Sequence, residues 1–186
     1  IVNKTIEGKS FRFSLQYENE NHDINQLIQK LAFLIGAFHD IGKATLYFQE
    51  YIKNPEKPHD QRKNHALLSA MFVYLVAKKY LEKQHITDDL KNLLTLFSFS
   101  SVKRHHGKLS NLNDEILISD ELQELLSDQV LTINSKEISE IIKDLTMDFN
   151  FSLTWEEFVD FIKNKDYYDE FEELSFDLLD DQYPEF

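Results

Sequence analysis

Hydrophobic residues recur at helical spacing along most of the chain. Between residues 24 and 38 they fall at every third or fourth position, as on one face of a helix. The same spacing predicts further helices over 44–53, 64–83, 88–106, 114–127 and 135–147. Thr154 and Glu157 form the capping-box pattern that opens a helix to about Lys163. We therefore expect an all-α protein.

An alternating pattern near the N-terminus is the exception to helical spacing. Phe11 and Phe13 alternate with polar residues, which predicts a short strand or hairpin arm within residues 2–16. Asn64 precedes the longest predicted helix and is a candidate N-cap. Only four Gly and three Pro occur in 186 residues, too few for a turn-dense β-sandwich. We expect a single helical domain over residues 1–186.

The net charge of −13 is concentrated at the C-terminus. Residues 155–186 hold 12 acidic and 2 basic residues, whereas the other 154 residues hold 21 and 18. We expect an acidic C-terminal helical segment over 155–186 that is solvated or docks a partner. The nearly neutral remainder leaves room for a local basic patch, so nucleic-acid binding is not excluded.

Composition also limits the metal chemistry and the cellular setting. Because the chain has no Cys, disulfides and thiolate metal sites are excluded, and a metal would need histidine and carboxylate ligands. The longest apolar runs, 31–38 and 70–77, are too short to span a bilayer. The first ten residues are mixed and polar, unlike a signal peptide. We expect a cytoplasmic protein without membrane association.

Four of the seven histidines fall at the ends of predicted helices. His39 and Asp40 follow the first of these helices. His65 opens the next long helix, and His105 with His106 closes the one after. Antiparallel packing brings alternate helix ends together, and a cluster of imidazoles with one carboxylate suits Mn, Fe, Co, Ni or Zn. Each histidine alone would be an ordinary surface residue at a helix end, so only the joint pattern indicates a metal site.

Three motifs carry a resemblance to a known family. They are His-Asp-Ile-Gly-Lys-Ala-Thr over 39–45 with Phe48, Gln49 and Tyr51 following, His-Ala-Leu-Leu-Ser-Ala over 65–70, and Val-Lys-Arg-His-His-Gly over 102–107. With them the sequence resembles HD-superfamily phosphohydrolases, and more closely the HD nuclease domain of the type I CRISPR interference nuclease-helicase. The resemblance spans residues 31–112. It implies an HD-domain fold and metal-dependent cleavage of single-stranded DNA, or of RNA, in defence against foreign nucleic acid.

Roles for individual residues follow from the same resemblance. Asp40 and Lys43 are the implied catalytic residues, Asp40 bridging two metal positions and Lys43 lying beside a substrate phosphate. The implied metal-ligating histidines are His39 at one position and His65, His105 and His106 at the other. The implied cofactor is one or two divalent transition metal ions per chain, Mn, Ni, Co or Fe, with Mg as an alternative.

Basic residues flank the histidine pair. Lys103, Arg104 and Lys108 form a collar suited to contacts with a nucleic-acid backbone, although an ordinary solvated helix end explains them equally well. The implied partners are single-stranded nucleic acid, a helicase and a CRISPR surveillance complex. No Gly-x-x-x-x-Gly-Lys-Ser/Thr phosphate loop occurs, so the helicase would be a separate subunit, or the chain a domain excised from a fusion.

Two ligands of the family pattern have no clear counterpart, a histidine upstream of the HD pair and an aspartate near the C-terminus. On one continuous helix, the 17 residues between His22 and His39 would span roughly 25 Å, too far for one site. The aspartates available near the C-terminus are Asp166, Asp169, Asp177, Asp180 and Asp181. Three explanations stay open: segments missing from the chain, a mononuclear site, or a weakened site.

Several other residues receive structural interpretations. His59 and Asp60 repeat the HD dipeptide within a Pro-containing loop, without Gly and Lys at the matching spacing, so we interpret them as a surface pair. Phe97 falls at a helical core position. Tyr47 and Tyr51 could stack on bases, but we expect them to pack in the core.

Two other functions stay open. The chain could be an HD phosphohydrolase that acts on nucleotides or other small phosphate esters. It could also be a degenerate, non-catalytic HD domain that docks a partner through its acidic tail.

Overall fold

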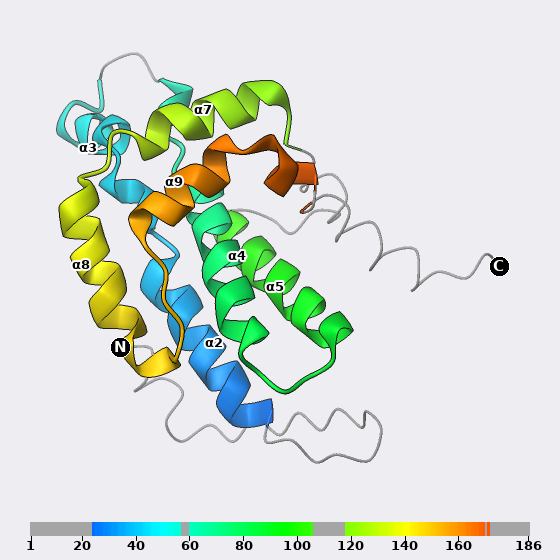
Figure 1. Cartoon of the computed structure of the whole chain (residues 1–186). Helices are drawn as coiled ribbons and strands as arrows, with labels where there is room; N and C mark the ends of the chain where they lie inside the picture. Colours follow the sequence, from blue (N-terminus) through cyan, green and yellow to red (C-terminus); the bar gives the residue numbers. More distant parts are fainter. Residues whose placement is uncertain (1–23, 57–59, 106–117, 170, 172–186) are drawn as a thin grey trace.

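Helices make up all the regular secondary structure in the part of the chain that the computed structural model describes, residues 24–56, 60–105, 118–169 and 171 (Figure 1). The labelled α-helices are α2 (Ile24–Phe38), α3 (Leu46–Lys53), α4 (Ala66–Glu82), α5 (Asp88–Lys103), α7 (Asp120–Val130), α8 (Ser135–Thr146) and α9 (Trp155–Lys163), and residues 165–169 are helical as well. Short 3₁₀ helices are η1 (Ile41–Ala44), η2 (Gln61–Lys63) and η3 (Met147–Phe149). The predicted all-α fold is confirmed. The strand expected within 2–16 lies outside the described residues.

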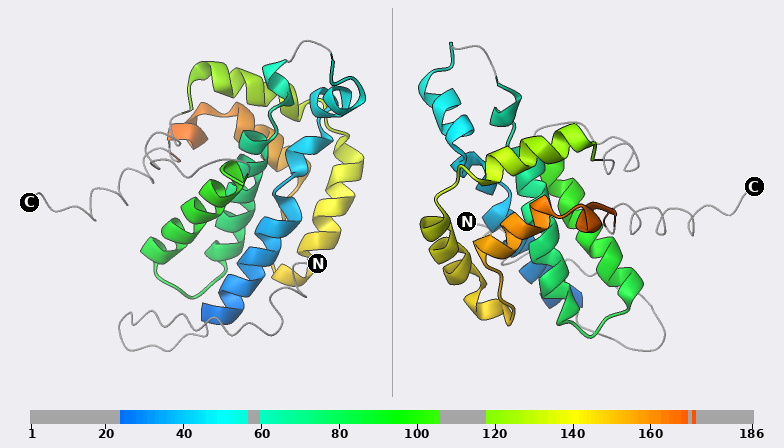
Figure 2. Two further views of the ribbon diagram at one scale, coloured as in Figure 1. Left: turned by 180° about the vertical axis from the view of Figure 1, so that it is seen from behind. Right: turned by 45° about the horizontal axis from the view of Figure 1, so that its top comes forward.

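The central element is α4, which is hydrophobic around most of its circumference. Twelve of its 17 residues are buried, the pattern of a helix enclosed by others. It packs most extensively against α5, and α2 also lies against it (Figures 1 and 2). The first turn of α4 and the last turns of α2 and α5 lie at the same end of this three-helix layer, and α7 and α9 cross near that end (Figure 1).

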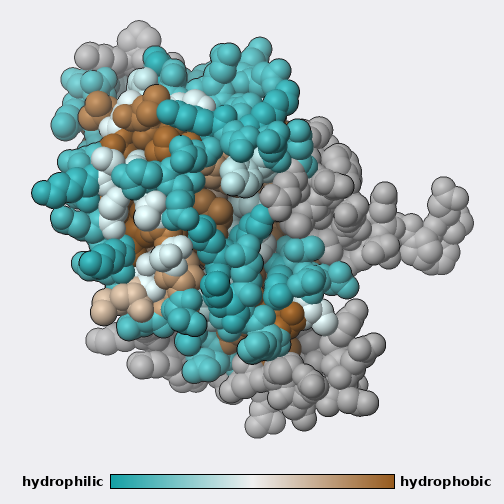
Figure 3. Space-filling view, in the orientation of Figure 1, coloured by the Kyte–Doolittle hydropathy of each residue, from teal (hydrophilic) through white to brown (hydrophobic). Residues whose placement is uncertain are grey.

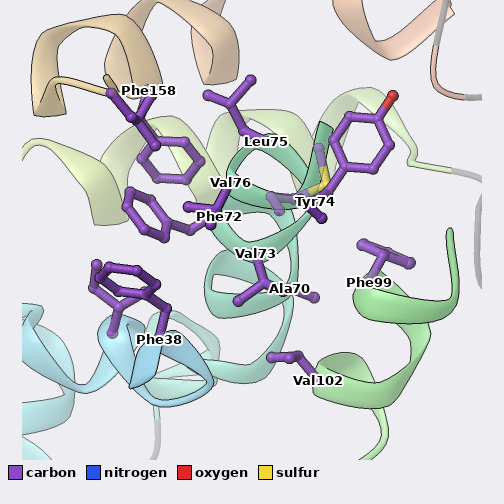
Figure 4. Packing of buried hydrophobic residues seen from close by; sticks show 14 of the residues in the cluster. Phe38, Ala70, Phe72, Val73, Tyr74, Leu75, Val76, Phe99, Val102 and Phe158 are labelled. Atoms are coloured by element: carbon purple, nitrogen blue, oxygen red, sulfur yellow. The ribbon is translucent and has the colours of Figure 1, made fainter. Parts of the chain in front are cut away.

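Aromatic rings of α4 pack against rings of α2 and α9 (Figure 4). Phe72 of α4 lies edge-on to Phe38 of α2, with ring centroids 5.1 Å apart, and to Phe158 of α9 at 4.9 Å. Tyr74 of α4 makes a similar contact with Phe171, at 4.8 Å. All five rings are buried. Since burying one large apolar side chain contributes about 1.5–3 kcal/mol, these contacts fix α2 and α9 against α4.

The predicted helix boundaries agree with the structure at both ends of α2, but several other predicted helix ends were wrong. The helix predicted over 114–127 continues to Val130, and α3 begins at Leu46, two residues after the predicted start. The N-cap of α4 is His65 and not Asn64. Asn64 instead ends η2 with an extended backbone, and its carbonyl accepts a 2.8 Å hydrogen bond from the Gln129 side chain. The predicted helix 88–106 ends early, at Lys103, so His105 lies in the turn that follows α5.

The predicted core position of Phe97 was also wrong. Its side chain is 62% exposed, and Leu93, one turn earlier, is exposed as well. The buried face of α5 includes Leu96, Phe99 and Val102. Because apolar residues occur on both sides of α5, their spacing alone does not tell which side faces α4.

The tyrosines of α3 lie outside the core too, contrary to the prediction. No residue of α3 is fully buried, and Tyr51 is 37% exposed. Figure 3 shows hydrophobic side chains at the surface near α3 and the junction of α7 with α8, where Leu46 and Leu131 are exposed. Within the described part of the chain, no helix has the length and apolarity needed to cross a membrane.

The capping box predicted for α9 is confirmed. The Thr154 hydroxyl accepts a hydrogen bond from the Glu157 amide, and the Glu157 carboxylate accepts one from the Thr154 amide at 2.7 Å. Lys79 of α4 donates to the same carboxylate at 2.9 Å. Burial acts to raise the pKa of Glu157, but the hydrogen bonds from Lys79 and Thr154 outweigh it and hold the pKa below its ordinary 4.5.

We predict that Glu157→Gln lowers the free energy of unfolding by about 0.5 kcal/mol at pH 7, because the amide keeps the cap but loses the ion pair with Lys79. A carboxyl group with a lowered pKa in the folded state stabilises the fold above its unfolded pKa, and this contribution is lost as the pH falls through the folded value. Urea unfolding followed by circular dichroism between pH 7 and pH 3 should therefore show the difference from wild type disappearing at low pH. Glu156→Gln removes the same charge from the same exposed turn and is the matched control. An equal loss in both variants would contradict a specific role for the pair with Lys79.

Candidate metal centre

The HD dipeptide lies in the turn between α2 and η1, and Gly42 holds this turn against α4. The Gly42 amide donates a 3.0 Å hydrogen bond to the buried Ser69 hydroxyl, one helical turn after His65. A Cβ atom at Gly42 would lie 2.5 Å from the carbonyl oxygen of His65. Only glycine therefore permits this approach, which brings Asp40 beside the first turn of α4.

His65 is positioned by residues on both sides of it in space. The Gln129 side chain of α7 donates to the carbonyls of Arg62 and Asn64, at 2.6 and 2.8 Å, and so anchors the segment that leads into α4. Phe48 of α3 lies edge-on to the His65 ring, with centroids 4.8 Å apart. The His65 side chain is consequently only 11% exposed.

His39 and His105 both direct Nε2 toward Asp40, as His65 does. His39 Nδ1 lies 2.8 Å from the Gly36 carbonyl, and His105 Nδ1 lies 2.5 Å from the Val102 carbonyl. A carbonyl oxygen only accepts hydrogen bonds, so each Nδ1 carries the proton. In the neutral ring the lone pair is then on Nε2, the nitrogen that faces Asp40. Metal-ligating histidines typically have this arrangement, in which the other ring nitrogen donates a hydrogen bond to a carbonyl or carboxylate oxygen.

The two carboxylate oxygens of Asp40 have different neighbours. Oδ1 lies 3.4 Å from His65 Nε2 and 3.3 Å from His105 Nε2. Oδ2 lies 3.2 Å from His39 Nε2 and 2.8 Å from the Lys43 ammonium, which donates a hydrogen bond to it. One carboxylate thus joins two imidazoles on one side and an imidazole with an ammonium on the other.

The surroundings of Asp40 favour its ionised form. Burial acts to raise the pKa of this carboxyl, but the hydrogen bond from Lys43 and the charges of His39, Lys43 and His65 outweigh burial and hold the pKa below its ordinary 3.8. Asp40 is therefore a carboxylate at neutral pH. In this form it is available as a metal ligand.

The Oδ1 side of Asp40 fits a metal ion. One ligand atom each from Asp40, His65 and His105 lie within 4.8 Å of one another. A transition metal bound at about 2.0–2.2 Å from each ligand requires ligand atoms roughly 3–4 Å apart. The distances from Asp40 Oδ1 to His65 Nε2 and to His105 Nε2, 3.4 and 3.3 Å, lie in this range. Asp40 Oδ1 is buried, and no described residue offers it a hydrogen bond. A bound metal ion would satisfy this buried oxygen.

The structure thus brings together five of the predicted site residues, His39, Asp40, Lys43, His65 and His105. His106, Lys108, His22 and three of the C-terminal aspartates, Asp177, Asp180 and Asp181, lie outside the described residues. Lys103 and Arg104 lie at the end of α5, and the Lys103 ammonium is 5.6 Å from the centroid of the Phe99 ring. Asp166 and Asp169 belong to the segment after α9.

Asp60 of the second HD dipeptide has a structural role. His59 is outside the described residues, but Asp60 caps η2 by accepting a 2.9 Å hydrogen bond from the Arg62 amide. Its carboxylate also pairs with the Arg62 guanidinium. This pair holds Arg62 over the ring of Tyr47, with Cζ 4.3 Å from the ring centroid.

Sequence reasoning assigned no role in the site to Ser69, Phe48 or Gln129. Ser69 and Phe48 belong to the stretches that carry the resemblance, yet neither has the chemistry of a ligand. Gln129 lies 64 residues after His65, on another helix, and no local pattern connects the two. Their effect on the site depends on contacts made only in the folded chain.

The fold and the site together define an all-α protein with a candidate three-ligand metal centre built from one aspartate and two histidines. No family model, curated protein or solved structure matches this chain.

We predict that Gly42→Ala displaces η1 from α4 and weakens binding of Mn²⁺ at least tenfold, because a Cβ atom cannot lie 2.5 Å from the His65 carbonyl oxygen. We also expect a loss of about 1–3 kcal/mol in the free energy of unfolding, since the amide of residue 42 would lose its buried partner Ser69. Isothermal titration calorimetry and urea unfolding measure the two effects. Ala44→Ser, at an exposed position of the same 3₁₀ helix, is the control. Wild-type metal affinity in Gly42→Ala would contradict the role of this contact.

Proposed function

We propose that the protein is a metal-dependent phosphodiesterase of the HD type that cleaves single-stranded nucleic acid. The observation that carries the proposal is the convergence of Asp40, His65 and His105 on one point. The resemblance of the three sequence motifs to HD nucleases supports the same reaction class. The carboxylate and imidazole ligands of this site suit a divalent transition metal such as Mn, Fe, Co or Ni.

A divalent metal on these residues would polarise a phosphodiester and lower the pKa of a water molecule that attacks it. Asp40 would hold that ion through Oδ1, and His65 and His105 would hold it through Nε2. Lys43 lies on the other carboxylate oxygen with its side chain 35% exposed, so its ammonium can turn toward a substrate phosphate and neutralise its charge. His39, 42% exposed, lies on the solvent side of the cluster, where a substrate would approach.

Single-stranded DNA is the substrate that we propose, with RNA as its alternative. Hydrolysis of mononucleotides alone, without cleavage of single strands, would favour the phosphohydrolase hypothesis. Absence of both metal binding and cleavage would favour a docking domain. The helicase and the CRISPR surveillance complex stay predictions of the resemblance.

We predict that Asp40→Asn abolishes both tight metal binding and cleavage of a labelled oligonucleotide, while the far-ultraviolet circular dichroism stays that of the helical fold. The amide keeps the shape of the side chain but lacks the negative charge that a metal requires. Calorimetry with Mn²⁺, Co²⁺ and Ni²⁺ and a gel-based cleavage assay measure the two losses. Asp89→Asn, in the exposed first turn of α5, is the matched control and should behave as wild type. Cleavage retained by purified Asp40→Asn would refute the proposed function.

We also predict one tight metal-binding event per chain, with any second event at least tenfold weaker. The Lys43 ammonium lies against Oδ2 and repels a second cation on that side of Asp40. Lys43→Gln should therefore strengthen the second event in a titration with Mn²⁺, whereas Lys53→Gln, in the last turn of α3, should not. Two equally tight events in the wild-type protein would contradict this expectation.

A further inference from the structure

A row of aromatic rings leads from the surface of α3 to the candidate metal centre. Tyr51 lies 6.1 Å from Phe48, and Phe48 lies 4.8 Å from His65, measured between ring centroids. His65 is in turn 5.7 Å from His105. Tyr51 is 37% exposed, Phe48 is partly buried and His65 is buried. The row therefore begins at the solvent-exposed Tyr51 and ends at the two histidines that face Asp40 Oδ1.

Lysine ammonium groups accompany these rings. Lys63 Nζ lies 4.3 Å from the centroid of the Tyr51 ring, and Lys43 Nζ lies 5.8 Å from that of Phe48. The whole segment 43–63 carries five basic and three acidic residues, a net charge of +2 in a chain of net charge −13. A polyanion would therefore be drawn to this part of an otherwise acidic molecule.

The surface that carries these residues is held in place by contacts from other elements. The Gln129 amide binds the carbonyls of Arg62 and Asn64, on either side of Lys63, and so fixes the backbone that presents this lysine. Arg62 covers the Tyr47 ring of α3 and donates to its hydroxyl at 2.9 Å. These contacts fix α3 relative to the segment before α4, so the rings of α3 keep their distance from Lys63.

We propose that Tyr51, Phe48, Lys63 and Lys43, here called the α3 track, bind single-stranded nucleic acid. A base stacks at the exposed Tyr51 ring, Lys63 and Lys43 contact the phosphates, and the strand leads past Phe48 toward Asp40. Stacking requires an accessible base face, which a single strand offers and a duplex conceals. The direction of the strand toward a cleavage site rests on the proposed function, but binding to the α3 track requires no metal.

Fluorescence anisotropy of a labelled 15-nucleotide poly(dT) strand with the whole chain, in EDTA and low salt, tests the α3 track. We expect Tyr51→Ala to weaken binding roughly 5- to 100-fold, the usual effect of removing one stacking ring, and Tyr51→Phe to leave it unchanged. Lys63→Gln should weaken binding and reduce the slope of log affinity against log salt by about one phosphate contact. Tyr167→Ala, which removes a tyrosine of similar exposure (41%) after α9, should have no effect.

Three results would overturn the α3 track: wild-type affinity in Tyr51→Ala, equal competition by a duplex of the same length, or equal competition by a poly-aspartate peptide. The last would indicate an electrostatic site for acidic protein segments.

The proposed function is tested separately from the α3 track. If Asp40→Asn retains cleavage while Tyr51→Ala loses strand binding, the α3 track stands and the metal mechanism is wrong. If Tyr51→Ala binds normally while Asp40→Asn loses cleavage, the reverse holds.

Discussion

The enclosure of α4 is the constraint on which the rest of the structure depends. Because this helix is apolar on nearly every side, α2, α5, α7 and α9 must cover it, and rings such as Phe38, Phe72 and Phe158 set where they lie. That packing places the last turns of α2 and α5 beside the first turn of α4. The candidate ligands come from these three places in the chain, so the site and the core are parts of one arrangement.

The second organising feature is the concentration of basic groups around one carboxylate. Asp40 faces His65 and His105 through one oxygen and His39 and Lys43 through the other. The chain as a whole is strongly acidic, yet the neighbouring segment 43–63 has a net charge of +2. If this site holds a cation through Asp40 and attracts an anion through its lysines, as we propose, it meets the electrostatic requirements of phosphodiester hydrolysis.

The sequence predicted local features well and three-dimensional ones unevenly. The bounds of α2 and the capping box of α9 followed from spacing and from residue types within one helical turn. The three motifs together named five residues that the fold brings together. Phe97 and the tyrosines of α3 were placed in the core because apolar and aromatic side chains at helical spacing do not reveal which face a neighbouring helix covers. The N-cap at Asn64 failed because Gln129, from a distant helix, binds its carbonyl.

By itself, then, the sequence determined the helical class, most helix positions and the residue types available for a metal. Local periodicity and capping depend on contacts within about four residues, which a sequence displays directly. Only the tertiary structure decided that Oδ1 and Oδ2 of Asp40 have different neighbours, that Gly42 must lack a side chain, and that Tyr51 and Lys63 meet at the surface. Most of these arrangements join residues more than ten positions apart, and even the division of neighbours at Asp40 depends on how separate helices pack. Local sequence patterns carry no record of that packing.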